Sequence, residues 1–546
     1  MKTPLEYFLQ WEQAMPDQHF ARQPMAHGKE IWSYEKAGNE ARRIAAGLKK
    51  LGLLPGDKVA ILSKNCAQWV IADLAIMMGG FISVPLYATI TAETIEQILL
   101  HSESKAVIVG KLDNFTAQAP GIPEHVEDIV IEAYKNKGTN SWELMLQQNE
   151  PITELHQYTS PDELISIMYT SGTTGMPKGV MHTVGNFSRL LGMLHYIGLK
   201  EKPEIFSYLP MSHIAERIGI EMAGMALGGT FNFSYSIDSF GADLQEVQPH
   251  YFFAVPRIWQ KFREKVEEKL PPKKLNRMLS IPILRSIVRK KVQKALGLSR
   301  AYRVFSGAAP LSVELMQWYD KLGITIYQAY GMTEDCIYCH FNIPEHNRFG
   351  SVGKPLPGLE ARISSDGEIQ VKCDALTTGY YKEPALTAEL FTTDGYLHTG
   401  DVGEYDADGF LFITGRLKDQ FKTDKGKYIA PAPIELRFAS HPLIDQACLV
   451  GVGLPQPVIL ATLAPDTAKG VSKHEIELAM VKQTALINKD LQSHERIAKV
   501  VLLPEAWTVE NGLMTPTLKV KRNVLEKQFN SRYADWYNTL GEVVWA

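Results

Sequence analysis

Apolar and polar positions alternate along the first part of the chain in the rhythm of strands separated by helices. Between residues 39 and 109, a helical pattern ending near Leu51 is followed by the strand-like run VAILS, an apolar helix, and the runs FISVPL and AVIVG. This alternation predicts parallel strands covered by helices. The most apolar stretch, residues 74–86, is interrupted by glycine and proline and is shorter than the roughly 20 residues of a membrane-spanning helix. We therefore expect it to be a buried helix that leads into a buried strand.

Four further apolar runs end at glycine or proline turns and are also predicted to be strands. They are SIMYT before Ser171, YFFAV before Pro256, YRVFS before Gly307 and TIYQAY before Gly331. After Asp401 the pattern changes, because DADG at 406–409 stands between short apolar runs, as in a β-hairpin. We expect an α/β fold with a large N-terminal domain of parallel and mixed sheets layered with helices, residues 1–417. A small α+β C-terminal domain, residues 418–546, is expected to follow.

Composition narrows the classes of protein that the chain can belong to. Its 546 residues, of which 45% are hydrophobic and 22% charged, are typical of a soluble enzyme with more than one hydrophobic core. A net charge of -4 provides no general attraction to nucleic acid, so no nucleic-acid partner is expected. Five scattered cysteines indicate a reducing compartment, and the N-terminal residues lack the apolar core of a signal peptide. A cytoplasmic location is expected.

The densest chemical signal is the segment YTSGTTGMPKG at residues 169–179. Its glycines let the backbone approach a polyphosphate, and its hydroxyls and lysine can donate hydrogen bonds to phosphate oxygens. It is not a Walker A loop, because Pro177 precedes the lysine and Gly179 follows it, where that motif has Gly-Lys-Ser/Thr. The predicted ATP contacts in this segment are Thr170, Ser171, Gly172, Thr173, Thr174, Gly175 and Lys178.

TSGTTGMPKG resembles the phosphate loop of the adenylate-forming superfamily, which contains acyl-CoA synthetases, peptide-synthetase adenylation domains and luciferases. Further motifs follow in that family's order as far as Arg522, and the final ones are most similar to those of long-chain fatty acyl-CoA synthetases. The resemblance implies that the N-terminal domain binds ATP and the acyl substrate. It also implies that the C-terminal domain is mobile and carries the lysine used in adenylation.

Two motifs resemble the family's adenine and phosphate segments. They are SGAAP at 306–310 and YQAYGMTE at 327–334. The residues implied to lie around the adenine are Gly307, Ala308, Ala309, Tyr330 and Gly331, with Tyr330 stacking on the base. The resemblance also implies that Thr333 meets the α-phosphate and that Glu334 holds Mg²⁺, an ion that usually takes one or two protein carboxylates together with substrate phosphates.

Two motifs near the predicted domain boundary complete the implied nucleotide site. Asp401, in HTGD, matches the family's ribose ligand, and Arg416 matches an arginine that touches ribose or phosphate. Lys418 occupies the hinge position, where many relatives have aspartate. Gly426 lies near the implied thiol channel.

The last motif, LMTPTLKVKR at 513–522, resembles the family segment whose lysine bridges the substrate carboxylate and the ATP phosphates. We assign this role to Lys519. Leu518 replaces the usual glycine before this lysine, so Lys521 remains the alternative. His213, in YLPMSHIAE, matches a family motif between the phosphate loop and the acyl site, with a purely structural histidine as the alternative.

Residues 271–300 contain nine basic and no acidic side chains among several isoleucines, leucines and valines. A basic amphipathic segment of this kind can lie on an anionic membrane surface, here the inner face. The alternative is an ordinary solvated helix face. The CIYCH sequence at 336–340 matches a haem attachment pattern, and we attribute that match to chance.

The resemblance implies a two-step ligase. A carboxylate and ATP first give acyl-AMP and diphosphate, and acyl transfer to coenzyme A then gives acyl-CoA and AMP. The expected small-molecule partners are ATP and a medium- to long-chain fatty acid, with coenzyme A as the acceptor; a homodimer is left open. The alternatives are an acyl-AMP ligase that loads a carrier protein and an aryl or short-chain acid-CoA ligase. Because the chain ends shortly after Lys519, we expect the acceptor to be a separate molecule.

Overall fold

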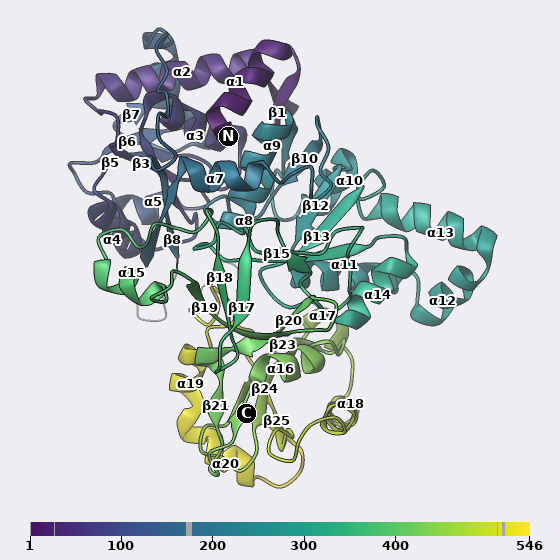
Figure 1. Ribbon diagram of the computed structural model, residues 1–546. Coiled ribbons are helices and arrows are strands. Elements are labelled where there is room, and N and C mark those ends of the chain that lie inside the picture. Colours follow the sequence, from purple (N-terminus) through teal and green to yellow (C-terminus); the bar gives the residue numbers. More distant parts are fainter. Residues whose placement is uncertain (1, 27, 171–176, 510, 516–518) are drawn as a thin grey trace.

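The computed structural model describes residues 2–26, 28–170, 177–509, 511–515 and 519–546 (Figure 1). Its largest sheet has seven strands in the order β7-β6-β5-β3-β4-β8-β9. The strands are β3 (Lys58–Leu62), β4 (Ile82–Leu86), β5 (Ser104–Val109), β6 (Glu127–Val130), β7 (Asn140–Ser141), β8 (Leu164–Thr170) and β9 (Lys178–Thr183). All neighbours are parallel except β8 and β9, which run antiparallel. The parallel arrangement expected from the alternating pattern is therefore confirmed.

Two further sheets extend this N-terminal part. One has the order β10-β11-β1-β2 and the other β12-β13-β14-β15-β16. The first contains β1 (His19–Met25), β2 (Gly28–Ser33), β10 (Glu204–Ser207) and β11 (Thr230–Phe233). The second contains β12 (Tyr251–Ala254), β13 (Arg303–Ser306), β14 (Ile326–Tyr330), β15 (His340–Phe341) and β16 (Lys354–Pro355). The runs YFFAV, YRVFS and TIYQAY thus supply three parallel neighbours, β12, β13 and β14.

Helices cover these sheets and close the core. They are α1 (Pro4–Ala14), α2 (Tyr34–Lys50), α3 (Ala67–Gly79), α4 (Ala92–Ser102), α5 (Phe115–Gln118), α6 (Trp142–Gln148), α7 (Val184–Leu191), α8 (Ile214–Glu216), α9 (Ala223–Leu227), α10 (Phe240–Val247), α11 (Pro256–Lys269), α12 (Pro272–Ser280), α13 (Pro282–Ala295), α14 (Val313–Lys321) and α15 (Pro384–Leu390). Every residue of α3 is buried, and the chain passes from it directly into the buried strand β4. The expectation for residues 74–86 is confirmed. No helix within the described ranges combines the length and apolar character needed to cross a membrane.

An antiparallel sheet follows and leads to the C-terminal elements. Its strands are β17 (Glu360–Ile363), β18 (Glu368–Lys372), β19 (Leu397–Tyr405) and β20 (Leu411–Arg416). The predicted hairpin is present, because β19 and β20 pair on either side of residues 406–409.

The C-terminal elements form an α+β unit at the lower end of Figure 1. Its strands are β21 (Phe421–Lys422), β22 (Tyr428–Ile429), β23 (Ile444–Val450), β24 (Val458–Leu463), β25 (Lys499–Leu503) and β26 (Val543–Trp545), and its helices are α16 (Pro431–Ala439), α17 (Pro465–Ala468), α18 (Lys473–Asn488), α19 (Arg522–Phe529) and α20 (Tyr533–Asn538). The two buried apolar clusters of this unit draw only on residues from Phe421 onward, whereas the N-terminal clusters draw only on residues before it. The expected fold class, a large α/β part and a smaller C-terminal part, is confirmed.

A buried ion cluster joins two helical segments inside the N-terminal part. Arg217, in the π-helical turn η3 (Arg217–Met222), donates from Nη2 to Asp73 Oδ1 at 2.8 Å, and its Nη1 lies 3.6 Å from Glu221 Oε2. All three side chains have 0% exposure. The guanidinium also lies 5.2 Å from the ring centre of Trp69. Arg217 therefore supplies the positive charge that compensates the negative charge of a buried carboxylate.

Replacing Arg217 tests this role. Arg217→Met should lower the free energy of unfolding by about 3–5 kcal/mol, because it leaves the buried carboxyl groups of Asp73 and Glu221 without a cation. Urea unfolding measures the change. The control is Arg362→Met, since Arg362 pairs with Asp394 at the surface and its loss should leave the unfolding midpoint almost unchanged. Equal shifts in the two variants would contradict the assignment.

Candidate active site

The glycine-rich segment connects two antiparallel strands. Thr170, at the end of β8, lies opposite Lys178, at the start of β9. The predicted contacts Ser171, Gly172, Thr173, Thr174 and Gly175 lie outside the described residues. Because a strand and not a helix follows the loop, no helix N-terminus directly after it adds a partial positive charge. The cation supplied at this end of the loop is Lys178.

Glu334 lies next to this lysine and is almost completely buried. Its Oε1 accepts a hydrogen bond of 2.8 Å from the Tyr380 hydroxyl, and Lys178 Nζ lies 5.1 Å from the centre of the same tyrosine ring. Burial raises the pKa of Glu334, while the Tyr380 hydrogen bond and the charges of Arg416 and Lys178 oppose that rise. A further cation beside this carboxylate would therefore stabilise its ionised form.

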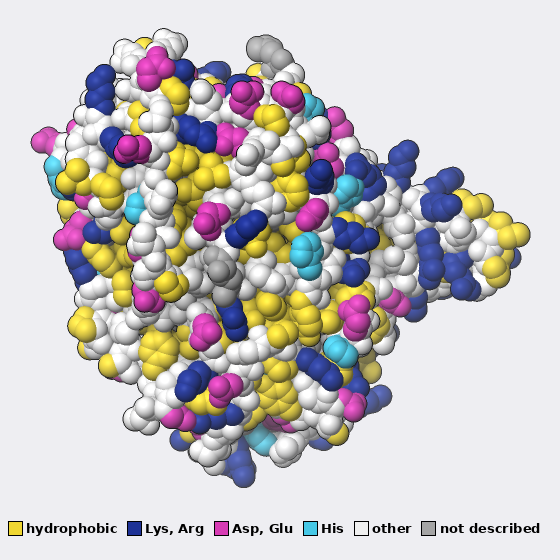
Figure 2. Space-filling view, turned by 45° about the horizontal axis from the view of Figure 1, so that its top comes forward, with side chains coloured by type: hydrophobic (Ala, Val, Ile, Leu, Met, Phe, Trp, Pro, Cys, Tyr) yellow, Lys and Arg dark blue, Asp and Glu magenta, His cyan; other side chains and the backbone are white. Residues whose placement is uncertain are grey.

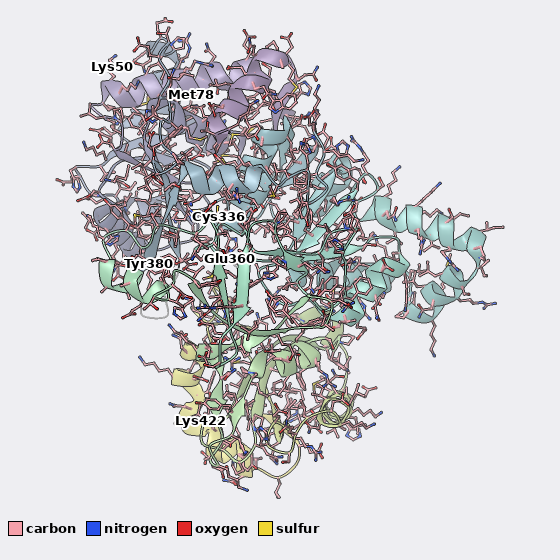
Figure 3. The ribbon with its side chains drawn as sticks, viewed as in Figure 1. Lys50, Met78, Cys336, Glu360, Tyr380 and Lys422 are labelled. Carbon is pink, nitrogen blue, oxygen red and sulfur yellow. The ribbon has the colours of Figure 1, made fainter. Side chains whose placement is uncertain are left out.

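Tyr380 comes from a segment that ties the phosphate hairpin to the Thr333-Glu334 turn. Val180, in β9, forms an antiparallel bridge with Tyr380. Thr377 donates its backbone N–H to the Glu334 carbonyl at 2.7 Å, and its hydroxyl donates to the Met181 carbonyl at 2.7 Å. In Figure 3, Tyr380 lies between the N-terminal elements and the C-terminal elements that carry Lys422. The segment fixes the relative position of Lys178 and Glu334.

Asp401 joins three strands at the other side of the site. Its Oδ2 accepts from the Tyr330 hydroxyl at 2.8 Å, and its Oδ1 accepts from Arg416 Nε at 2.8 Å. Tyr330 ends β14, while Asp401 and Arg416 are directly opposite each other in β19 and β20. Burial and the charge of Asp401 raise the pKa of Tyr330, so its hydroxyl stays protonated and can donate.

Close backbone approach shapes the segments expected to face the adenine. A Cβ at Gly307 would lie 2.9 Å from the Ala329 carbonyl, and one at Gly331 would lie 2.6 Å from Ile337 Cα. Ala308 has a φ of 65°, in the left-handed region that disfavours side chains. Ala309 follows it and is exposed. The SGAAP and YGMTE segments therefore depend on small residues for their conformation.

The turn after Tyr330 stores backbone strain beside the site. Cys336 and Ile337 have φ values of 57° and 51°, which are costly for a β-branched residue such as Ile337. The Met332 N–H donates to Asp335 Oδ1 at 2.8 Å, and the Ile337 N–H donates to the Met332 carbonyl at 3.1 Å. These bonds hold the strained turn. Thr333, half-buried within it, stands directly before Glu334.

His213 caps the short helix α8 and stays neutral. Its Nδ1 accepts from the Ala215 N–H at 3.3 Å, which leaves the ring proton on Nε2. Burial and the charge of Lys519 lower its pKa to about 4. Glu216 holds the preceding strand end, because its Oε1 accepts from the Ser207 hydroxyl at 2.7 Å and from the Tyr208 N–H at 2.9 Å. The motif YLPMSHIAE thus forms one hydrogen-bonded unit.

Lys519 approaches these groups from the C-terminal unit. The protein around it and the charge of Arg416 lower its pKa to about 8, and the charge of Asp401 opposes that change. Lys519 is nevertheless exposed to solvent. The Lys519 N–H donates to the Thr515 hydroxyl at 3.1 Å. A polyanion arriving at the site would therefore favour the protonated ammonium.

The two residues predicted to serve the second reaction lie on the C-terminal side of β20. Lys418 is in the 3₁₀ turn η4 (Leu417–Asp419), two residues after Arg416. Gly426 has a φ of 70° in the turn between β21 and β22, where its N–H donates to the Thr423 carbonyl at 3.0 Å. Their predicted roles remain predictions.

The donor set fits Mg²⁺ better than a metal held by protein alone. Among the residues that the structure describes, no group of three or more histidine, cysteine, aspartate or glutamate side chains could hold a metal ion. Glu334 offers one hard carboxylate beside the phosphate hairpin, and Mg²⁺ usually completes its shell with water and substrate phosphates. The residues present therefore suit a magnesium ion that arrives with a nucleotide.

Two family models match this chain. Residues 9–381 match the family model of the AMP-binding enzyme, and residues 418–541 match that of the AMP-binding enzyme C-terminal domain. The chain belongs to the AMP-binding enzyme family.

Other proteins of similar sequence agree with this membership. The long-chain-fatty-acid-CoA ligase FadD15 of Mycobacterium bovis is 31% identical over 92% of each chain. Long chain acyl-CoA synthetase 5 of Arabidopsis thaliana is 28% identical over 94% of this chain and 88% of its own. The predicted resemblance to the adenylate-forming superfamily, and to its long-chain fatty acyl-CoA synthetases, is confirmed.

Solved structures of similar fold include two adenylate-forming proteins. The adenylation domain of the carboxylate reductase from Mycobacterium chelonae has a TM-score of 0.84 at 22% identity, covering 98% of this chain and 91% of that chain. The anthranilate CoA ligase AuaEII, in complex with anthranoyl-AMP, has a TM-score of 0.80 at 19% identity, covering 98% of each chain. At these identities the likeness establishes the fold.

Five residues predicted from the motifs of this AMP-binding enzyme lie together in the structure, and one neighbour of theirs was not predicted. Tyr330, Glu334, Asp401, Arg416 and Lys519 are brought together around one region. Tyr380 was not predicted. The signal that could have found it is TTGYYKEP at 377–384, a run of hydroxyl-bearing residues around a glycine. Gly379 is required there, since a Cβ would lie 2.3 Å from Thr387 Cγ2.

Removing the Tyr380 hydroxyl tests its support of Glu334. Tyr380→Phe should weaken Mg²⁺-dependent ATP binding about tenfold, because the ionised carboxylate loses a donor and its pKa rises further. Titration calorimetry with and without Mg²⁺ measures the effect. The neighbouring Tyr381→Phe is the matched control, since the Tyr381 hydroxyl donates to the surface residue Glu103 at 2.9 Å. If both variants bind Mg²⁺-ATP like the wild type, Tyr380 has no such role.

Proposed function

We propose that this AMP-binding enzyme is an ATP-dependent acid-thiol ligase. It joins a medium- to long-chain fatty acid to coenzyme A through an acyl-adenylate. The observation that carries the proposal is the set of three cations, Lys178, Arg416 and Lys519, around the carboxylates of Glu334 and Asp401. Such an arrangement suits a reaction that must bring an anionic carboxylate up to a triphosphate.

The nucleotide is held from three directions in this proposal. Asp401 accepts hydrogen bonds from the ribose hydroxyls, since a carboxylate has lone pairs beyond those used by Tyr330 and Arg416. The ring of Tyr330 and the small residues Gly307 and Ala308 lie against the adenine. Lys178 and the hydroxyls of the glycine-rich loop donate to the phosphates, and Thr333 donates to the α-phosphate.

In the first step, an oxygen of the fatty-acid carboxylate attacks the α-phosphorus of ATP, and diphosphate leaves. Lys519 bridges the carboxylate and the α-phosphate and lowers the repulsion between them. Arg416 steadies the negative charge that develops on the phosphoryl oxygens. Glu334 would hold Mg²⁺, which when bound supplies positive charge to the triphosphate. Neutral His213, with its proton on Nε2, can donate to the acyl or phosphate oxygens without adding charge.

In the second step, the thiolate of coenzyme A attacks the acyl carbonyl carbon, and AMP leaves. Lys519 must withdraw to make room, so we propose that the C-terminal domain turns about Lys418 and that the thiol enters near Gly426. One ion pair would break in this turn, because Arg257 in α11 donates to Asp445 in β23 at 3.0 Å. The pair is partly exposed, so its loss costs little.

The lysine assignment predicts different effects on the two half-reactions. Lys519→Ala should slow acyl-AMP formation by about 10²–10³, because it removes one preorganised cation from the attacking carboxylate. Thioester formation from preformed acyl-AMP should change much less. Lys521→Ala is the matched control, and both half-reactions should stay near wild type, since Lys521 lies at the start of α19. Equal losses of rate in both half-reactions for Lys519→Ala, or a larger loss of rate for Lys521→Ala, would contradict the assignment.

The substrate is tested by product analysis over a series of acids. With ATP, Mg²⁺ and coenzyme A, fatty acids of medium to long chain should give acyl-CoA, AMP and diphosphate at higher kcat/KM than acetate or benzoate. A higher rate with a holo-carrier protein than with coenzyme A would favour the carrier-loading alternative. A preference for aromatic or short acids would favour the other ligase class, and release of ADP would contradict adenylation altogether.

A further inference from the structure

A helical hairpin stands away from the body of the protein and takes no part in the candidate active site. It consists of α12 and α13, which project to the right in Figure 1 and form the protrusion on the same side of Figure 2. Leu275, Val288 and Val292 are buried and anchor its inner face in the neighbouring apolar cluster. Gln293 adds a hydrogen bond of 2.9 Å to the Leu322 carbonyl. The rest of the hairpin surface faces solvent.

This outer surface is strongly basic. Figure 2 shows several dark blue side chains on the protrusion. The cations are Lys273, Lys274, Arg277, Arg285, Arg289, Lys290, Lys291, Lys294 and Arg300, and all except the half-buried Arg289 are exposed. Residues 271–300 contain no aspartate or glutamate to offset them. Arg285 and Arg289 donate to the carbonyls of Leu279 and Lys321, which fixes their side chains and leaves the charges in place.

The outer end of the hairpin is apolar and exposed. Ile283 is 76% exposed, and Ile281 and Ile287 are 43% and 46% exposed. They lie at and just after the junction of the two helices, and Figure 2 shows a yellow tip at the end of the protrusion. Isoleucine side chains exposed to water at the tip of a projecting element do not stabilise the fold. A basic collar behind an apolar tip matches the boundary of an anionic bilayer, where headgroups are negative and the adjoining layer is apolar.

We propose that the α12–α13 hairpin docks the protein on anionic phospholipid bilayers. Ile281, Ile283 and Ile287 enter the boundary between headgroups and acyl chains, while the surrounding lysines and arginines bind the headgroups. A polyanion such as nucleic acid or an acidic protein would use the cations alone, so the exposed isoleucines favour the bilayer. Docking needs no catalysis and is independent of the proposed reaction, although long-chain acids partition into the same bilayers.

The test is sedimentation of the full-length protein with lipid vesicles. We expect binding to vesicles that contain phosphatidylglycerol and none to pure phosphatidylcholine vesicles. Raising the salt from about 50 mM to about 500 mM should reduce binding at least about tenfold, because the Debye length shortens. If the protein does not bind phosphatidylglycerol vesicles at low salt, or binds both vesicle types equally, the proposal is wrong.

Two charge-reversal pairs locate the docking surface. Lys290→Glu/Lys291→Glu should lower vesicle partitioning at least about tenfold, because two attractive charges become repulsive. The matched control is Lys49→Glu/Lys50→Glu, another exposed pair at adjacent positions of a helix, on α2. This control should partition like the wild type. Equal losses in the two pairs would show a non-local charge effect and would overturn the assignment to the hairpin.

A third variant tests the apolar tip separately from the charge. Ile283→Ser should lower partitioning several-fold while thermal unfolding and binding to a soluble polyanion such as DNA stay unchanged, since Ile283 is exposed. Unchanged vesicle binding in Ile283→Ser would show that the apolar tip does not enter the bilayer. DNA binding as tight as vesicle binding in the wild type would assign the surface to a soluble polyanion. Either result would overturn the proposal. Because no readout depends on turnover, failure here leaves the proposed ligase reaction untouched.

Discussion

The site depends on the carboxylate of Asp401, which is shared between the hydroxyl of Tyr330 and the guanidinium of Arg416. A nearly buried carboxylate needs such partners, because burial penalises its charge unless hydrogen bonds and a cation replace water. This one interaction joins the end of β14 to the pair β19–β20, and β20 leads straight into the turn that contains Lys418. It therefore fixes the geometry at the point where the N-terminal part gives way to the C-terminal unit.

The pKa values of Lys519 and Glu334 are set by burial and by the charges around them. The surrounding protein and the charge of Arg416 lower the pKa of Lys519 to about 8, so without a nucleotide the environment disfavours the charged lysine. On the opposite side, burial raises the pKa of Glu334, and Lys178 and Tyr380 resist that rise. The protein alone therefore leaves the charged form of each of these two groups disfavoured. A polyphosphate with a divalent cation supplies the missing partners, which is the physical reason that the site suits a nucleotide.

Sequence patterns were sufficient where the chemistry is local. The strands before the site were predictable from apolar runs that end at turns, and Tyr330, Glu334, Asp401, Arg416 and Lys519 were implied by motifs that resemble those of the adenylate-forming superfamily. Tyr380 was not predicted: the run TTGYYKEP is a local signal, but the place of Tyr380 in the site arises from pairing with Val180, which is remote in the sequence. The same holds for the ion cluster of Arg217 and Asp73, which packing brings together. Basic composition indicated an amphipathic segment at 271–300, but only the three-dimensional fold revealed a projecting hairpin with an exposed apolar tip.

Isotope exchange in the absence of coenzyme A shows whether the site activates a carboxylate with ATP. The protein is incubated with Mg²⁺, ATP, labelled diphosphate and fatty acids of graded chain length. Label should enter ATP only when a fatty acid is present, because acyl-AMP formation is reversible. No exchange with any acid, or exchange that is equally fast without acid, would contradict carboxylate activation by ATP.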